Sequence, residues 1–60
     1  MNSTEQEINR VRLEIKMGKI MIKDAIRKGA LFEEIKEKTL HIKKLQARLD
    51  ELLAAKSREN

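Results

Sequence analysis

Cysteine, proline, tryptophan and tyrosine are absent from the chain, and histidine and phenylalanine occur once each. The absence of Cys excludes disulfides and thiol chemistry, and a single His leaves little scope for a stabilising metal site. Because 60 residues bury too little apolar surface to fold robustly alone, oligomerisation remains as the source of further stability. The composition therefore predicts a chain that associates with copies of itself.

Long apolar runs are also absent. None approaches the roughly 20 residues that a membrane-spanning helix needs, and residues 1–5 lack the basic and apolar segments of a secretory leader. We therefore expect a cytoplasmic protein without a membrane partner, and the lack of Cys fits a reducing compartment.

Residues that carry chemistry are scarce. The sequence has no Gly-rich phosphate loop and no Ser/His/Asp set. Glu37 and His41 could offer two metal ligands on one helical face, but zinc needs more ligands and di-iron bundles use a closer Glu-x-x-His spacing. We expect no enzymatic activity, no cofactor and no metal, with His41 at the edge of an apolar face beside Leu45.

Helix-favouring residues are abundant, and charged residues alone make up 40% of the chain. Thr4-x-x-Glu7 and Ser3-x-x-Gln6 both have the form of a capping box, in which two side chains satisfy the first backbone groups of a helix. This pattern predicts a helix that begins at Ser3 or Thr4.

Two helix-packing seams follow, each with apolar or small residues at alternating spacings of three and four. The first comprises Ile8, Val11, Ile15, Gly18, Ile22 and Ala25. The second comprises Leu31, Ile35, Ile42, Leu45, Leu49 and Leu52, with Lys38 in one position. Within the two halves, small residues seven apart would let helix backbones approach closely: Gly18 with Ala25, and Ala47 with Ala54.

The two seams are out of phase, and the phase changes near Gly29. A glycine there can adopt the left-handed conformation that ends a helix, with Leu31 packing back on the last turn. We predict an all-α fold, an antiparallel two-helix hairpin that dimerises into a four-helix bundle. A single domain, 1–60, would contain helices over about 4–28 and 32–56, a turn over about 29–31 and a frayed tail over 57–60. One long helix kinked near Gly29 is the alternative, because residues 30–32 include no good N-cap.

A second apolar group lies on the first helix, roughly opposite its seam: Leu13, Met17, Ile20 and Met21. These residues are interpreted as half of a dimer core or as a partner-binding face, for which adaptable Met side chains are suited. The candidate oligomer or partner interface comprises Leu13, Met17, Ile20, Met21, Ile35, Ile42, Leu45, Leu49 and Leu52.

A basic stripe runs between the two apolar groups of the first helix: Arg12, Lys16, Lys19, Lys23 and Arg27. Residues 1–30 hold seven Lys or Arg and four acids, whereas residues 31–60 hold seven and six, so most of the net charge of +4 lies in the first half. Such a stripe is either a solvated face or a surface for phosphates or acidic proteins. No aromatic, Asn or Gln residue is interleaved with it, which weakens the case for nucleic acid.

A hairpin of this size resembles in architecture the small helical regulators of plasmid copy number, with which it shares no motif. Leu49-Asp50-x-Leu52-Leu53, after a turn glycine, is similar to the small sporulation phosphatases, although Gln46 stands where they have Ser and the Leu-Asp pair is about seven residues late. We assign neither family. The favoured interpretation is a small regulatory or adaptor protein whose partners are its own copies and a larger protein, with nucleic-acid binding by the basic stripe as the alternative.

Overall fold

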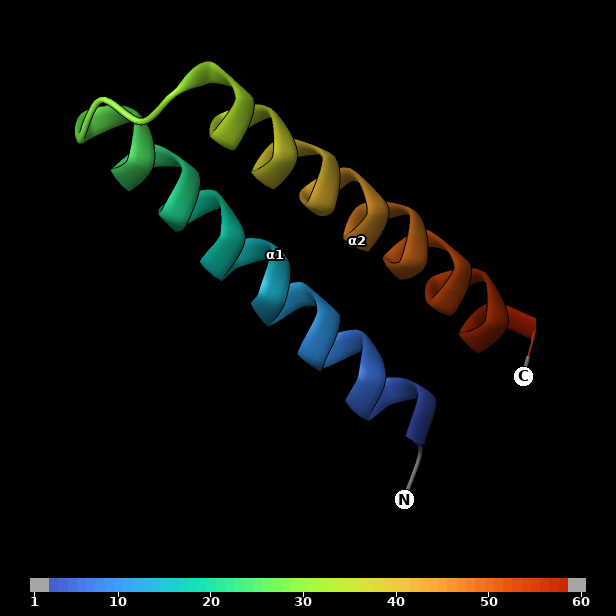
Figure 1. Ribbon diagram of the computed structural model, residues 1–60. Coiled ribbons are helices and arrows are strands. Elements are labelled where there is room, and N and C mark those ends of the chain that lie inside the picture. Colours follow the sequence, from blue (N-terminus) through green and yellow to red (C-terminus); the bar gives the residue numbers. More distant parts are fainter. Residues whose placement is uncertain (1–2, 59–60) are drawn as a thin grey trace.

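The computed structural model, which describes residues 3–58, contains two α-helices packed against each other. α1 (Ser3–Arg27) and α2 (Phe32–Arg58) lie side by side and antiparallel, joined by a short turn (Figure 1). The predicted hairpin is confirmed, and the alternative of one kinked helix is wrong. The helix bounds lie within two residues of those expected from the sequence. Ser57 and Arg58 belong to α2 rather than to a frayed tail, and residues 59–60 of that expected tail lie outside the described residues.

The hairpin is a single layer of helices. Its Cα extents are 46 × 17 × 11 Å, and the two helices lie side by side with no further element above or below them among residues 3–58 (Figure 1). A single layer has two open faces, so each helix can bury only the stripe that faces its neighbour.

The core lies in the half of the hairpin that holds the chain ends. It comprises Ile8, Val11 and Ile15 of α1 with Leu49 and Leu52 of α2, and Ile42 and Leu45 pack against it. Ala25 is buried further along α1, and the other two seam positions of that helix, Gly18 and Ile22, are half-buried. Among residues 3–58 no side chain is less than 2% exposed, so the interior is small.

Gly29 forms the end of α1 as the sequence predicts. Its φ of 78° is left-handed, which costs an L-residue strain that glycine avoids. The amide of Gly29 donates to the carbonyl of Ile26 at 3.1 Å, and that of Ala30 donates to Ala25 at 2.9 Å. These two bonds form a Schellman motif, which satisfies the last carbonyls of α1 and reverses the chain.

Leu31 does not pack back on α1, so that part of the prediction is wrong. Ala30 takes the position that closes the Schellman turn, and Leu31 follows it as the N-cap of α2, where its side chain is 77% exposed. Phe32, the first residue of α2, is exposed to a similar degree. Ala47 and Ala54 are exposed as well, so the close approach expected of them does not occur within the hairpin.

Replacing Leu31 by Ser should stabilise the hairpin by about 1 kcal/mol. The carbonyl of Leu31 already accepts the first helical bond, from Ile35 at 3.2 Å, but its side chain cannot accept a bond from the free amides of the first turn. A Ser at this position, three residues before Glu34, would complete a capping box. Urea denaturation tests this, with Leu40→Ser in the exposed interior of α2 as the matched control, expected to be slightly destabilising. Equal changes in the free energy of unfolding for Leu31→Ser and Leu40→Ser would show that a capping side chain at residue 31 contributes nothing to stability.

Candidate protein-interaction surface

An apolar groove runs between α1 and α2 on one face of the hairpin. Its volume is about 530 Å³. α1 lines it with Leu13, Glu14, Met17, Gly18 and Met21, and α2 with Glu37, Lys38, His41, Ile42 and Leu45. Apolar side chains form most of the floor, with four charged or titratable side chains among the lining residues, so the groove matches the chemistry of an amphipathic helix surface.

Gly18 leaves room for a side chain of α2 at the floor of the groove. A methyl group added at Gly18 would collide with the Cδ1 atom of Ile42 and lie 3.3 Å from its Cγ1 atom. The absence of a side chain at this position therefore lets Ile42 lie directly on the backbone of α1. The close approach of helix backbones predicted for Gly18 stays a prediction, because the contact seen here is with the Ile42 side chain.

The second apolar group of α1 remains uncovered in the hairpin. Leu13, Met17, Ile20 and Met21 are each between 53% and 58% exposed. Three of them line the groove, and Ile20 lies beside it, where it shares a shallow depression with Met21, Lys23, Asp24 and Arg27. An apolar patch of this kind is expected to associate with another apolar surface.

The α2 members of the candidate interface are less exposed than its α1 members. Leu49 and Leu52 are 8% and 7% exposed and belong to the intramolecular core, and Ile35 is half-buried. Ile42 and Leu45 contribute both to the core and to the groove. The hairpin thus uses Leu49 and Leu52 internally, and the outer surface is provided by α1 together with Ile42 and Leu45.

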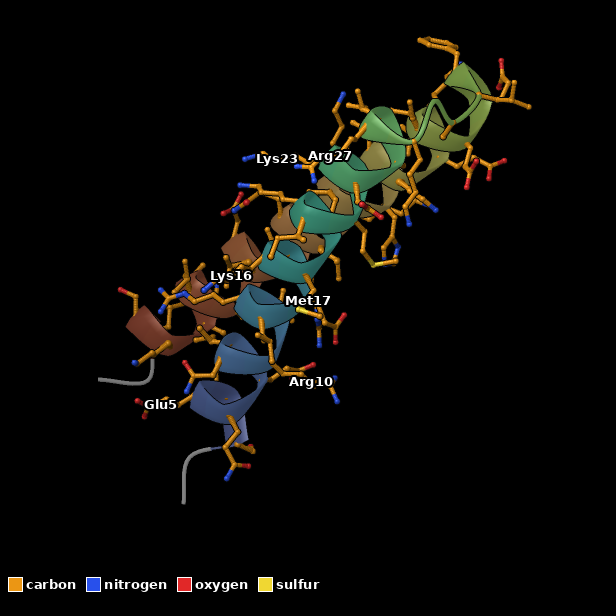
Figure 2. All side chains as sticks on the ribbon, turned by 90° about the vertical axis from the view of Figure 1, so that its left-hand side faces the viewer. Glu5, Arg10, Lys16, Met17, Lys23 and Arg27 are labelled. Atoms are coloured by element: carbon orange, nitrogen blue, oxygen red, sulfur yellow. The ribbon has the colours of Figure 1, made fainter. Side chains whose placement is uncertain are left out.

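The five side chains of the basic stripe are exposed and, within the described residues, none of them forms an ion pair: Arg12, Lys16, Lys19, Lys23 and Arg27. Other cations do have carboxylate partners, such as Arg48 with Glu7 at 2.9 Å and Lys28 with Asp24 at 2.9 Å. Figure 2 shows Lys16 projecting from one side of α1, and Met17 and Arg10 from the other. The stripe and the groove are therefore separate surfaces.

Sequence reasoning missed two features of this surface. Glu37 and His41 line the groove together with the seam residue Lys38, although only Lys38 and His41 were expected at the apolar face. The spacing of Glu37 and His41 places them on the flank of the α2 seam, and this could have shown that Glu37 borders it. Ile26 is a further exposed apolar side chain of α1 and is not among the residues that line the groove.

Glu7 and Arg48 connect the two helices next to the core. The Arg48 guanidinium donates a hydrogen bond to the Glu7 carboxylate, at 2.9 Å, and this bond and the charge of Arg48 lower the pKa of Glu7, to which Arg10 adds a smaller effect. Lys56 and Glu5 form a second, longer link between the helices, at 4.0 Å. Both links are exposed, so each contributes little to the stability of the hairpin.

Acid should weaken the hairpin partly through Glu7. Because the folded state lowers the pKa of Glu7 below its unfolded value, its contribution is present above the unfolded pKa and is lost as the pH falls through the folded one. The Glu7→Gln variant should therefore lose less stability than the unchanged chain between about pH 6 and about pH 3. Arg48→Gln removes the same pair from the other helix and should reduce the acid sensitivity in the same way. Denaturation curves at each pH that superimpose for all three chains would contradict this role.

None of the helices in residues 3–58 is long and apolar enough to cross a membrane. Within the same residues, no three His, Cys, Asp or Glu side chains come together as a candidate metal site. Comparison of the chain with protein-family models, curated proteins and solved structures finds no match.

Proposed function

We propose that this chain is a small cytoplasmic, non-enzymatic adaptor or regulatory protein that acts through helix-mediated protein contacts. It self-associates into a four-helix bundle and binds a larger protein through helix surfaces that the bundle leaves open. The observation that carries the proposal is the groove: Leu13, Met17 and Met21 are more than half exposed around an apolar channel between the helices. A chain with so small a core gains stability by covering these side chains.

Self-association also fits the shape of the hairpin. Two single-layer hairpins stacked face to face form two layers with a shared interior, which is the arrangement of a four-helix bundle. In that assembly, Leu13, Met17 and Met21 would be buried next to Ile42 and Leu45 and would enlarge the core against which those two residues pack. The basic stripe would remain outside it.

Replacing Met17 by Lys tests this proposal, because it puts a charge at the middle of the groove. We expect the variant to remain helical but to become monomeric, as measured by light scattering coupled to size-exclusion chromatography. The matched control is Ile26→Lys, which makes the same change at an equally exposed apolar residue of α1 outside the groove, and it should still associate. Unchanged association of the Met17→Lys variant would contradict the proposal.

Nucleic-acid binding is the second candidate, because all five cations of the basic stripe are exposed and without carboxylate partners among residues 3–58. It predicts steeply salt-dependent binding of labelled duplex DNA or an RNA hairpin. Reversing Lys16, Lys19 and Lys23 to Glu should abolish that binding, whereas reversing Lys36, Lys43 and Lys44 on α2 should preserve most of it. Equal losses from the two triple changes would indicate a nonspecific effect of net charge. Salt-insensitive retention of a protein partner would favour the adaptor function instead.

A further inference from the structure

The charges that border the groove on α1 have a regular order. Arg10, Met17 and Asp24 are spaced by seven residues, so they lie on one stripe of the helix with a cation at one end, an apolar centre and an anion at the other. Glu7, Glu14, Met21 and Lys28 are also spaced by seven and form a neighbouring stripe, with anions at one end and a cation at the other.

The stripe of Arg10, Met17 and Asp24 is complementary in charge to itself when its direction is reversed. If α1 of a second copy lies antiparallel across the groove and Met17 meets Met17, Arg10 lies opposite Asp24 of the other copy, and Leu13 lies opposite Met21. A parallel arrangement would instead place each of these charges opposite its like, which is repulsive.

The charges are positioned to make these contacts. Arg10 lies 3.7 Å from Glu14 and 3.9 Å from Glu7, and Asp24 lies 2.9 Å from Lys28, with the Arg10 side chain 70% exposed and that of Asp24 50% exposed. These existing pairs orient the charged groups without burying them. Antiparallel contact would join the two clusters into networks of alternating sign, which add specificity to apolar contact at the centre.

We propose that two copies of this chain dimerise with their α1 helices antiparallel across the groove and a two-fold axis at Met17. Arg10 and Asp24 of each copy pair with Asp24 and Arg10 of the other, and these pairs select the antiparallel orientation. The inference rests on the proposed self-association and adds its geometry, which a separate experiment can test.

Two complementary variants test the charge pairing. The Arg10→Asp chain carries acids at both ends of the first stripe, and the Asp24→Arg chain carries arginines at both ends. Each alone should dimerise about tenfold more weakly, because two exposed ion pairs become like-charge contacts. Mixed in equal amounts, they should recover affinity close to that of the unchanged chain as a heterodimer, measured by sedimentation velocity at low salt. A mixture that associates no better than its components overturns the proposed pairing.

A single introduced cysteine tests the two-fold axis independently, since the natural chain has none. Oxidation of the Met17→Cys variant should rapidly give a disulfide-linked dimer, because residues on a two-fold axis face each other. Lys16→Cys is the matched control, on the adjacent residue that points to the other side of α1, and should remain mostly monomeric under the same denaturing analysis. No cross-linking of Met17→Cys, or equal rates for both variants, overturns the geometry. If Met17→Lys abolishes association but the charge-pairing test or the cross-linking test fails, the groove remains the interface and the antiparallel orientation is rejected.

Discussion

Replacing Ile15 by Ala is expected to lower the free energy of unfolding by about 2–5 kcal/mol. Ile15 is 7% exposed and lies in the cluster that also holds Val11 and Leu49. The change removes buried methylene and methyl groups and leaves a cavity, which a hairpin with only two helices has few other contacts to offset. Because marginal stability is typical even of larger domains, much of the variant should be unfolded at room temperature, as measured by circular dichroism and urea denaturation.

Ile26→Ala is the matched control, since it makes the same truncation in the same helix at a side chain that is 57% exposed. Its effect should lie within about 0.5 kcal/mol, and Ala favours helix slightly more than Ile does. Both variants must be compared at one chain concentration, because association would add to apparent stability. Equal losses at the two positions would contradict the assignment of Ile15 to the core.

Replacing Gly18 by Leu is expected to destabilise the hairpin by about 1–3 kcal/mol, although Leu favours helix more than Gly does. The space beside Gly18 is filled by Ile42, which would collide with even a methyl group there. A Leu side chain must therefore displace Ile42 or separate α1 from α2. The expected result is a lower urea midpoint for Gly18→Leu.

Truncation of Ile42 to Ala should reverse the sign of this effect. Removing the Cδ1 and Cγ1 atoms of Ile42 makes room at Gly18, so Gly18→Leu should be stabilising in the Ile42→Ala background. A double-mutant cycle then gives a coupling between about 0.5 and 3 kcal/mol for residues in contact. Additive effects would show that Gly18 and Ile42 do not touch in solution.

The helices and their mutual packing could be predicted because they follow from periodicity. Ile8, Val11 and Ile15 repeat at spacings that place them on one stripe, and Leu49 and Leu52 do the same on the other helix. The change of phase at Gly29 located the turn, and the left-handed conformation of that residue has the physical cause that the sequence suggested. At these positions, the local conformational preference of each residue and its place in the packed hairpin favour the same structure.

The orientation of side chains beside the turn could not be predicted in the same way. Leu31 fits the second seam by spacing, but the Schellman motif uses Ala30 to close the turn and leaves Leu31 as an exposed N-cap. The lining of the groove depends on how α1 and α2 are rotated toward each other, which places Glu37 and His41 in the same groove as Met17. The spacing of residues within one helix does not determine how that helix is rotated relative to its neighbour.

The groove links the fold to the proposed function. The hairpin covers one stripe of each helix and leaves Leu13, Met17 and Met21 exposed beside Ile42 and Leu45. These side chains would raise the tendency to aggregate if no defined surface covered them. We propose that a second copy of the chain, matched in the order of its charges, covers them.

Sedimentation equilibrium of the unchanged chain at micromolar concentration and at two salt concentrations, alongside circular dichroism, decides whether self-association occurs. We expect a helical dimer whose association weakens moderately at high salt, because apolar contact provides most of its stability and the rim charges provide the remainder. A chain that is monomeric at both salt concentrations would contradict self-association. The groove would then have to be covered by a different protein.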